Sequence, residues 1–505
     1  MLFSSTYSIC YSGLKTHPIE IEIDFSKEKG NCITLVGLPD IAVKESKDRV
    51  LTAIKNSGCT LPLANCTINL APGHLKKEGP LYDLPIAMCL LASANLFDAA
   101  LLKDYLIVGE LGLNGQTRAI GGALGAAMLA SKLKKRGIIL PFANAKEATF
   151  IKDLDVIGVK NIQEALSFFL KPTAEHIQPK TEFIEESTSA NPLVDLSEIC
   201  GQQHAKRALE IAAAGGHNIL LSGPPGTGKS MLAKALEGIM PPLSLKEALE
   251  VTYIHSIAQS HDPHSNLIRM RPFRAPHHTI SFAGMIGGGS IPKPGEVCLA
   301  HRGILFLDEL PEFSRTALEV LRQPLEEKKV TVSRAQGQFT FPTDFICIAA
   351  MNPCPCGYLG HPTKTCSDSA LQIERYQSRI SGPLLDRIDM HIEMSPINYE
   401  ELVEKQEQGE SSAVVQKRVI EARRVQHARY GVVKSNSHMS RHQINAILKE
   451  NPGCKGVIKE AMDQMGLSAR GADRLLKLAR TIADLSHAER VSEEHLLEAL
   501  SYRIR

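Results

Sequence analysis

The sequence contains no tryptophan, few aromatic residues and no long apolar run. Aromatic residues make up 5% of the 505 positions, which weighs slightly against recognition by stacking on single-stranded bases. No run of roughly 18 uncharged apolar residues is present. The segment Met1–Pro18 lacks a basic leader followed by an apolar stretch and a cleavage site. We therefore expect a soluble, cytoplasmic protein with no membrane partner.

An excess of charge of one sign is also missing. Lys and Arg number 57 against 55 Asp and Glu, a net charge of +2, so any polyanion must be bound by a local basic patch. Twelve cysteines are too few for a disulfide scaffold in a chain of this length. Hydrophobic residues at 43% are ordinary for globular proteins, and the length predicts about three domains.

Short apolar runs and helix-like stretches divide the chain into four segments. Residues 1–170 alternate the two patterns, which predicts a mixed α and β domain. Residues 171–193 are polar and contain prolines, as in a linker. Residues 194–396 form a second strand-and-helix series. Residues 397–505 have helical spacing with almost no strand pattern, which predicts a smaller helical domain.

A phosphate-binding loop follows the apolar strand Asn218–Ser222. It precedes a helical stretch and has the pattern G-x-x-x-x-G-K-S, in the residues Gly223, Pro224, Pro225, Gly226, Thr227, Gly228, Lys229 and Ser230. Its glycines let backbone N–H groups surround a phosphate, and the helix N-terminus adds positive charge. Lys229 would reach the β and γ oxygens of ATP, and Ser230 would ligate Mg²⁺. A chance glycine loop is the alternative, and both flanks argue against it.

Two carboxylates end the next apolar strand, Gly303–Leu307. By this pattern Asp308 holds Mg²⁺ and Glu309 orients or deprotonates the attacking water. Acidic residues also end ordinary strands at sheet edges, so the interpretation depends on the phosphate loop. A third strand, Phe345–Ala350, leads to Asn352, which could place a water against the γ-phosphate or simply be a polar strand end.

Four segments resemble the magnesium-chelatase-like AAA+ ATPases of the bacterial YifB/ComM family: GQQHAKRALEIAAAGGHNILLSGPPGTGKS, RPFRAPHHTISFAGMIGGGSIPKPGEVCLAHRGILFLDELPEF, AAMNPCPCGYLG and RISGPLLDRIDMHIE. The resemblance spans nearly the whole chain. It implies an α/β fold, with an AAA+ core built on a parallel sheet, a helical lid, and a Lon-protease-like α+β domain before them. It further implies an ATP- and Mg²⁺-dependent DNA motor, a branch-migration helicase of natural transformation.

Two other function classes stay open. The first is a chelatase-type AAA+ ATPase that remodels a protein partner. The second is a non-enzymatic assembly factor, which the intact Asp308-Glu309 pair argues against.

The resemblance also implies roles for Asn352 and for several arginines. Asn352 matches the sensor-1 position and Arg387, in LLDRID, the arginine finger, with Arg379 as a competitor. Arg470 is the first choice for sensor 2 and Arg474 the second. A finger acts on the phosphates of the neighbouring subunit, so the expected assembly is a homo-hexameric ring. Without the resemblance, each of these arginines would be read as a surface residue.

Two basic segments are candidates for DNA contact without sequence reading. Between Ser265 and Arg302 there are five basic residues, one acid and a triple glycine, as in an inserted loop, and its candidates are Arg269, Arg271, Arg274 and Lys293. Residues 328–341 alternate around a polar turn, which predicts a β-hairpin. Related hexameric helicases project a hairpin there into the pore, which makes Lys329 and Arg334 candidates. Solvated turns without a partner are the alternative.

Three cysteines gather just after the third strand. Cys354, Cys356 and Cys366 could hold zinc with His361 or Asp368 as the fourth ligand. Family members carry Cys-x-Cys at the second pair, whereas this chain has Cys366-Ser-Asp368. Three free thiols are the alternative.

The N-terminal domain resembles the Lon-type protease fold, yet lacks that family's catalytic residues. Glu78-Gly-Pro80 stands where the nucleophile loop begins, but Leu81, Tyr82 and Asp83 follow, and Leu124 occupies the place of the general-base lysine. We expect no proteolysis, and a scaffold or DNA-facing collar instead.

Overall fold

The computed structural model describes residues 3–26, 30, 32–77, 79–185, 192–258, 267–289, 292–334, 337–396, 409–451 and 453–503. The chain forms two compact units. Unit 1 consists of Met1–Ile184 with Leu245–Ile268, and unit 2 consists of Glu185–Ser244 with Arg269–Arg505. The segment 245–268 thus lies inside the range 194–396 in sequence but belongs to unit 1.

A seven-stranded mixed sheet forms the centre of unit 1, in the order β3-β4-β2-β1-β5-β8-β9. β1 and β2 pair antiparallel along their whole length, whereas β5, β8 and β9 run parallel to β1. The strands are β1 (Phe3–Ser12), β2 (Lys15–Phe25), β3 (Ile33–Val36), β4 (Cys66–Ala71), β5 (Tyr105–Ile107), β8 (Gly137–Pro141) and β9 (Asp155–Val159). A small hairpin joins β6 (Glu110–Leu111) to β7 (Thr117–Arg118).

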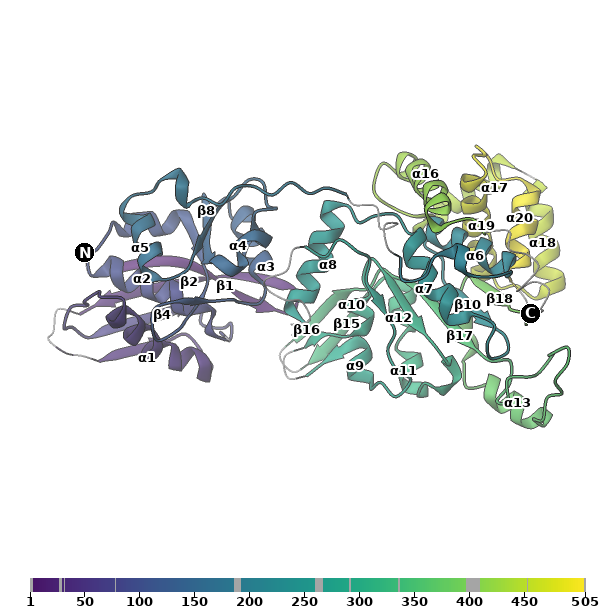
Figure 1. The fold of residues 1–505 in the computed structure, drawn as a ribbon, viewed down its shortest axis with the longest axis horizontal. Helices are drawn as coiled ribbons and strands as arrows, with labels where there is room; N and C mark the ends of the chain where they lie inside the picture. The colour runs from purple at the N-terminus through teal and green to yellow at the C-terminus, as the bar shows by residue number, and fades with distance from the viewer. Residues whose placement is uncertain are drawn as a thin grey trace. The chain divides into compact units, whose positions relative to one another are not determined.

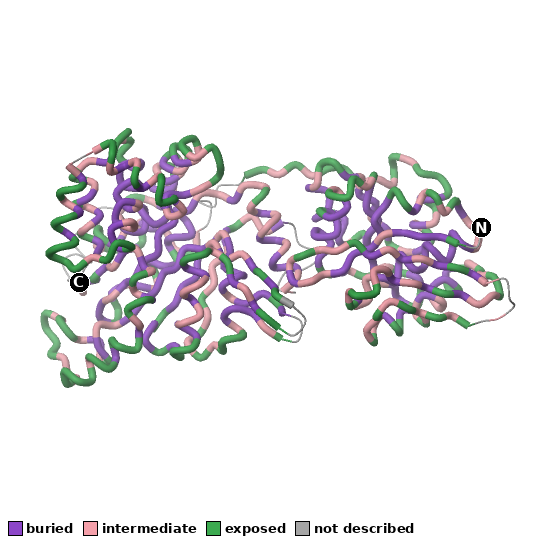
Figure 2. The backbone as a smooth tube through the Cα atoms, turned by 180° about the vertical axis from the view of Figure 1, so that it is seen from behind, coloured by how far each residue is buried: buried purple, intermediate pink, exposed green. Residues whose placement is uncertain are grey.

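Helices cover both faces of this sheet because its strands alternate two sets of apolar side chains. In β5, Ile107 belongs to the core on one face and Leu106 to the core on the other. Helices α1 (Ile41–Asn56), α2 (Asp83–Ser93) and α5 (Ile162–Leu170) cover the first face, and α3 (Ala123–Lys132) and α4 (Phe142–Ala148) the second. Figure 2 shows the buried backbone segments of this unit in purple and the exposed ones in green.

Helix α8 (Leu245–Ile257) completes unit 1 from a distant part of the sequence. Tyr253 packs so tightly on α3 that a Cβ at Gly125 would lie 2.4 Å from its ring. The Tyr253 hydroxyl donates to the Leu14 carbonyl oxygen over 2.8 Å. Leu124 and Phe150 are buried in the same cluster. The apolar face of α8 is therefore part of the unit 1 core.

Unit 2 is built on a five-stranded sheet in the order β11-β14-β17-β10-β18, and all of its strands are parallel. The strands are β11 (Phe273–Arg274), β14 (Ile304–Leu307), β17 (Ile346–Met351), β10 (Ile219–Ser222) and β18 (Met390–Glu393) (Figure 1). Helices α6 (Gln203–Gly215) and α7 (Lys229–Ile239) pack on it. The expected parallel-sheet core is confirmed.

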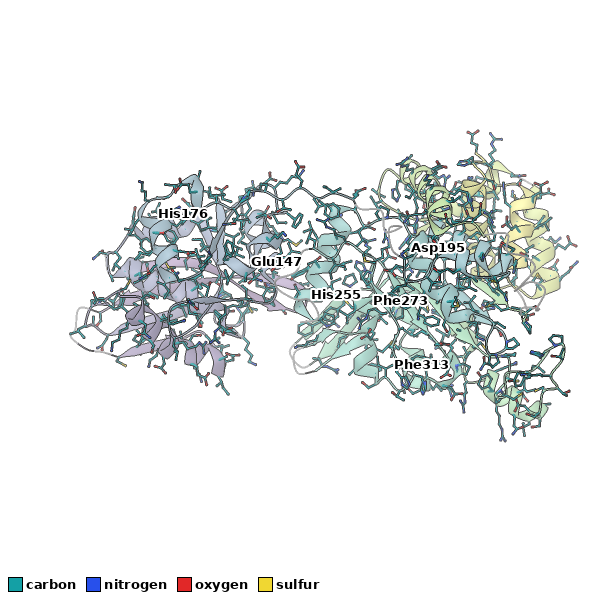
Figure 3. All side chains as sticks on the ribbon, viewed as in Figure 1. Glu147, His176, Asp195, His255, Phe273 and Phe313 are labelled. Atoms are coloured by element: carbon teal, nitrogen blue, oxygen red, sulfur yellow. The ribbon has the colours of Figure 1, made fainter. Side chains whose placement is uncertain are left out.

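The C-terminal helices continue the same hydrophobic core. They are α16 (Ser412–Tyr430), α17 (Arg441–Glu450), α18 (Gly453–Met465), α19 (Ala469–Leu485) and α20 (Glu493–Ser501). Asp195, labelled in Figure 3, connects the start of unit 2 to the first residue of α16. Its carboxylate accepts hydrogen bonds from the backbone N–H groups of Ser197 and Ser412. Shorter elements of unit 2 are α9 (Phe282–Ile286), α10 (Glu296–Leu299), α11 (Arg315–Glu319), α12 (Arg322–Glu327), α13 (Ala370–Gln377) and α14 (Gly382–Leu385).

The segment expected as a linker is partly attached to unit 1. Gln178 donates its backbone N–H to the Val156 carbonyl oxygen, and Thr181 shares a hydrogen bond with Thr149. Residues 186–191 and 397–408, which belong to the expected linker and to the start of the expected helical domain, lie outside the described residues. Within the described part of the chain, no helix is both long and apolar enough to span a bilayer.

Candidate nucleotide-binding site

The phosphate loop connects the carboxyl end of β10 to the first turn of α7. Gly226 and Gly228 have φ values of +82° and +86°, which disfavour any residue with a side chain. No heavy atom lies within 4 Å of a Cβ built on either glycine, so this side of the loop is open to a ligand. At Gly223 a side chain is excluded by lack of space, because a Cβ would lie 2.6 Å from the Met394 carbonyl oxygen.

Lys229 is hydrogen-bonded to the phosphate loop. Its Nζ donates to the carbonyl oxygens of Gly223 and Pro224 over 2.6 and 2.8 Å, and contacts Asn352 Oδ1 at 3.3 Å. Burial lowers the pKa of the Lys229 ammonium, and the nearby Asp308 carboxylate opposes that shift. The predicted lysine at the start of α7 and the predicted sensor asparagine after β17 are therefore brought together.

Ser230 and Asp308 also meet, as a magnesium site requires. Ser230 Oγ donates to Asp308 Oδ2 over 3.0 Å, and Asp308 Oδ1 accepts from the Glu309 backbone N–H over 2.9 Å. Ser230 lies in the first turn of α7 and Asp308 directly follows β14, so both are at the carboxyl edge of the sheet. A hydroxyl and a carboxylate at this spacing are hard oxygen ligands suited to Mg²⁺.

Glu309 follows in a left-handed conformation with φ of +50° and is exposed. Its Oε2 lies 3.3 Å from His278 Nδ1, and the His278 ring packs edge-on against Phe313, labelled in Figure 3. No sequence pattern predicted His278 as a partner of the candidate base. The only sequence signal for His278 is the His277-His278 pair, which lies in one of the segments that resemble the family.

The predicted arginine finger lies at the opposite edge of the sheet. Arg387 precedes β18, which runs parallel to β10, so it belongs to the amino edge, whereas the phosphate loop leaves the carboxyl edge. A four-residue strand separates these edges by roughly 10 Å before the loops are counted. Arg387 therefore points away from the phosphate loop of its own chain.

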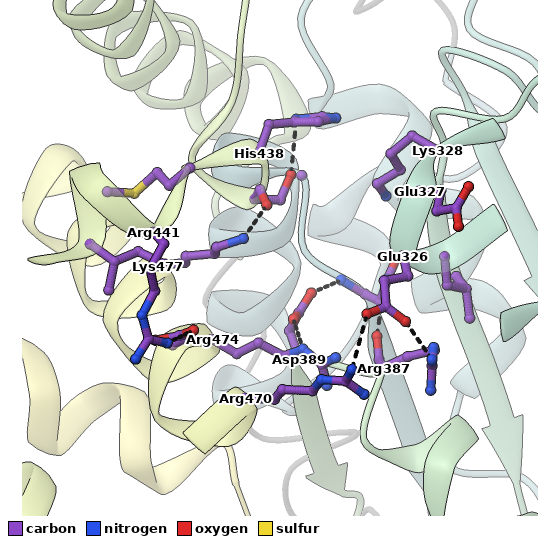
Figure 4. Close-up of a pocket in the computed structure, with 17 residues that line it drawn as sticks. Glu326, Glu327, Lys328, Arg387, Asp389, His438, Arg441, Arg470, Arg474 and Lys477 are labelled. Atoms are coloured by element: carbon purple, nitrogen blue, oxygen red, sulfur yellow. Dashed lines mark hydrogen bonds and ion pairs between the residues drawn. The ribbon is translucent and has the colours of Figure 1, made fainter. Parts of the chain in front are cut away.

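Arg387 and Arg470 share one carboxylate at this amino edge. Glu326, in α12, is paired with Arg387 and lies 3.9 Å from Arg470, and all three line a cavity of about 520 Å³ (Figure 4). Lys328, Arg441, Arg474 and Lys477 line it as well. The Arg387 side chain is only 14% exposed and that of Arg470 is 69% exposed. Glu326 carried no pattern in the sequence that would have singled it out.

The competing arginines have other partners. Arg379 is 54% exposed and pairs with Glu312 over 3.0 Å. Arg474 is 17% exposed and lies 3.7 Å from Asp389. Burial raises the pKa of the Asp389 carboxyl, whose side chain is 12% exposed, but the adjacent His217 and Arg474 outweigh this effect and keep the pKa well below the ordinary range. Arg474 is thereby engaged with Asp389.

The candidate DNA residues fall into two groups. Arg271 is buried and donates to the backbone carbonyl oxygens of Pro241, Pro242 and Arg302, and Arg274 forms a bidentate ion pair with Glu296. Arg269 is half-buried at the start of this segment of unit 2. Arg271 and Arg274 are engaged in holding the fold.

Lys293, Lys329 and Arg334 are exposed. The predicted hairpin is present as β15 (Lys329–Arg334) and β16 (Gly337–Pro342), and residues 335–336 at its turn lie outside the described residues. Lys293 pairs with Gly288 in the small hairpin of β12 (Gly287–Gly288) and β13 (Lys293–Pro294). A Cβ on Gly288 would lie 3.4 Å from Arg334 Nη2, so the two hairpins are neighbours at these residues.

The three clustered thiols face one another in the loop after Asn352. Cys354, Cys356 and Cys366 lie together with Asp368, with all four ligand atoms within 4.8 Å of one another. His361, the other fourth-ligand candidate, accepts from the backbone N–H groups of Thr363 and Lys364 instead.

The positions that correspond to a protease dyad are apolar or structural. Leu124 is fully buried, and Tyr82 is buried at the start of α2. Asp83 is buried and pairs with Arg49 over 3.0 Å. Glu78 lies outside the described residues. These side chains contribute packing and an internal ion pair.

Comparison with known proteins finds relatives along the whole chain. Residues 195–402 match the family model "Magnesium chelatase, subunit ChlI", residues 21–144 "Subunit ChlI of Mg-chelatase", and residues 409–503 "Magnesium chelatase, subunit ChlI C-terminal". Competence protein ComM of Haemophilus influenzae is 42% identical over 100% of this chain and 98% of its own length. YifB of Salmonella typhimurium is 43% identical over 97% and 95%. A Lon protease of Roseiflexus castenholzii is 26% identical over 29% of this chain and 19% of its own.

Proposed function

Because the chain belongs to the ComM/YifB family of magnesium-chelatase-like AAA+ ATPases, we propose that it is an ATP- and Mg²⁺-dependent hexameric DNA motor. Its substrates would be branched recombination intermediates in natural transformation, and its activity branch migration. The observation that supports the ATPase cycle most directly is the meeting of Lys229 with Asn352, and of Ser230 with Asp308, within hydrogen-bonding reach.

In this proposal each residue of the carboxyl edge has one task. The loop N–H groups and Lys229 bind the β- and γ-phosphates, and Ser230 and Asp308 hold the metal ion. Bound Mg²⁺ would neutralise the negative charge that develops on the phosphates. Asn352 orients the attacking water and Glu309 accepts its proton, with His278 fixing the direction of the carboxylate.

The amino edge serves the neighbouring subunit. Arg387 and Arg470 lie together and far from their own phosphate loop, so their positive charges are available to phosphates held by the next subunit of a ring. Arg387 must exchange Glu326 for a phosphate oxygen when the ring closes. This arrangement supports the assembly of identical subunits into a closed ring, for which six is the number expected from the family.

The exposed cations of the two hairpins are the candidate DNA surface. Lys293, Lys329 and Arg334 are exposed cations on β-hairpins, and no recognition helix accompanies them among the described residues of these segments. Such a surface binds phosphates with little regard for sequence. We retain these three residues and Arg269 as contacts and assign Arg271 and Arg274 to the support of the loops.

The match to magnesium chelatase subunits favours a second candidate, an ATPase that remodels a protein partner. The two are distinguished by measuring ATP hydrolysis with branched DNA, with single-stranded DNA and with candidate protein partners. Stimulation by DNA supports the motor. Stimulation by a protein alone, with no response to DNA, would favour remodelling.

We also propose zinc as a further metal, bound by Cys354, Cys356 and Cys366.

Replacing Arg334 by Ala is expected to weaken DNA binding equally for unrelated sequences and to leave ATP affinity unchanged. The slope of log K against log salt should fall by about 0.7 to 0.9 for each phosphate that the protein no longer neutralises. Binding would be measured by fluorescence anisotropy over a salt series. Arg118→Ala, which changes an exposed arginine on the β6–β7 hairpin of unit 1, is the matched control and should leave the slope unchanged. An unaltered slope in Arg334→Ala would remove this hairpin from the DNA surface.

A further inference from the structure

The loop that follows β17 brings three sulfur atoms to nearly equal separations. Cys354 Sγ lies 3.4 Å from Cys356 Sγ and 3.6 Å from Cys366 Sγ, and the third separation is 3.5 Å. A disulfide needs an S–S distance of about 2.0 Å, so these are three separate thiols. Ligands about 2.3 Å from a tetrahedral zinc ion would be about 3.8 Å apart, close to the observed triangle.

A carboxylate completes this triangle to four ligands. Asp368 Oδ2 accepts the Cys356 backbone N–H over 2.8 Å and lies 3.8 Å from Cys366 Sγ. A hydrogen bond of this kind fixes the orientation of a ligating carboxylate. Three thiolates and one carboxylate match the ligand types and the closed fourfold set of a structural zinc site.

The loop has few other means of holding its shape. Between Pro355 and Arg375 only Gly357 is buried. Gly357 has φ of +83°, and a Cβ there would lie 2.6 Å from Pro225 of the phosphate loop. At the far end, Gln377 donates to the Pro353 carbonyl oxygen over 3.0 Å. The loop thus touches the phosphate loop directly and begins next to Asn352.

We propose that Cys354, Cys356, Cys366 and Asp368 bind one Zn²⁺ ion, which orders this loop and through it supports Pro225 and Asn352. The metal cross-links a loop whose other residues are mostly exposed, so its binding free energy is used to fold the loop. The ligand set stands on the geometry alone. The effect on Pro225 and Asn352 rests on the proposed ATPase function, since it concerns the position of the phosphate-binding residues.

The ligand set is tested by the metal content of the full-length protein, purified without a histidine tag. Inductively coupled plasma mass spectrometry should find about one zinc per chain in the wild type and almost none in Cys356→Ser or Cys366→Ser. Cys32→Ser, which changes an exposed cysteine elsewhere, is the control and should keep its zinc. Zinc absent from the wild type, and not taken up when ZnCl₂ is added, would overturn the site, as would iron in its place.

Asp368 has its own test, the rate at which zinc passes to a chromogenic chelator. Loss of a residue that only hydrogen-bonds to a ligand already lowers metal affinity about 10- to 100-fold. Loss of the ligand itself should cost at least as much, so Asp368→Asn should release zinc at least about tenfold faster. Asp368→Cys supplies a fourth thiolate and should retain zinc as well as the wild type does. Equal release rates in the wild type and Asp368→Asn would exclude Asp368 as a ligand.

The structural role is tested separately. Chelation should expose the loop 353–369 to limited proteolysis and lower ATP turnover, and added Zn²⁺ should reverse both. Zinc loss with unchanged proteolysis and unchanged turnover would overturn the supporting role and leave the ligand set standing. A zinc-loaded protein without any ATPase activity would instead contradict the proposed function.

Discussion

Replacing Glu309 by Gln is expected to leave ATP binding intact and to lower its hydrolysis by about 10² to 10⁴-fold. The amide is nearly isosteric with the carboxylate, so the hydrogen bond between Ser230 and Asp308 and the phosphate loop are unaffected. The variant lacks the carboxylate that would accept a proton from the attacking water. The measurements are nucleotide affinity by equilibrium titration and the steady-state rate of phosphate release.

A neighbouring carboxylate provides the control for this prediction. Glu312 lies three residues further along the same loop and pairs with Arg379 at the protein surface. Glu312→Gln should therefore hydrolyse ATP at nearly the wild-type rate. Wild-type turnover in Glu309→Gln would remove Glu309 from the mechanism, and equal losses in both variants would indicate a general disturbance of the loop.

Arg387→Ala is expected to assemble and to bind ATP, yet to hydrolyse it about 10³ to 10⁵-fold more slowly. The guanidinium of Arg387 lies at the amino edge of the sheet, so in the proposed ring it would stabilise phosphate charge only across a subunit boundary. Arg379→Ala is the matched control, because this exposed arginine is the other candidate finger. A large loss in Arg379→Ala with little change in Arg387→Ala would exchange their roles.

Mixing two inactive variants tests the direction of the interaction. Lys229→Ala subunits lack the phosphate lysine but keep the finger, and Arg387→Ala subunits are the reverse. In randomly mixed rings about a quarter of the interfaces combine an intact site with an intact finger, so a corresponding fraction of wild-type turnover should return. If every mixture stays inactive although mixed rings form, Arg387 acts within its own chain or only in folding.

Much of the ATPase core could be predicted because its signals are local. The strand and helix around the phosphate loop, the hairpin at 328–341 and the helix Ser412–Tyr430 each follow from apolar spacing and turn residues over fewer than about twenty positions. The residues of the carboxyl edge follow for the same reason, since each lies at the end of an apolar strand or in the loop and helix that directly follow it, and these strands are parallel.

What could not be predicted depends on contacts between distant segments. Charge counting made Arg271 a candidate for DNA, yet its guanidinium is buried against three backbone carbonyl oxygens that no sequence pattern reveals. That Arg387 and Arg470 share Glu326 depends on β18 lying beside β10, a matter of strand order. The partner of Glu309 was hidden similarly, because His278 lies in a different segment, well before it in the chain.

The assignment of helix α8 to unit 1 has a consequence for how the protein is made. The N-terminal unit lacks α8 until residue 268 has been synthesised, which is after the phosphate loop has been made. A fragment that begins at residue 185 would carry Leu245, Leu249 and Tyr253 without the apolar surface that receives them. A single cut near residue 185 therefore leaves unit 1 without α8, and it leaves unit 2 carrying an apolar helix with no surface to cover it.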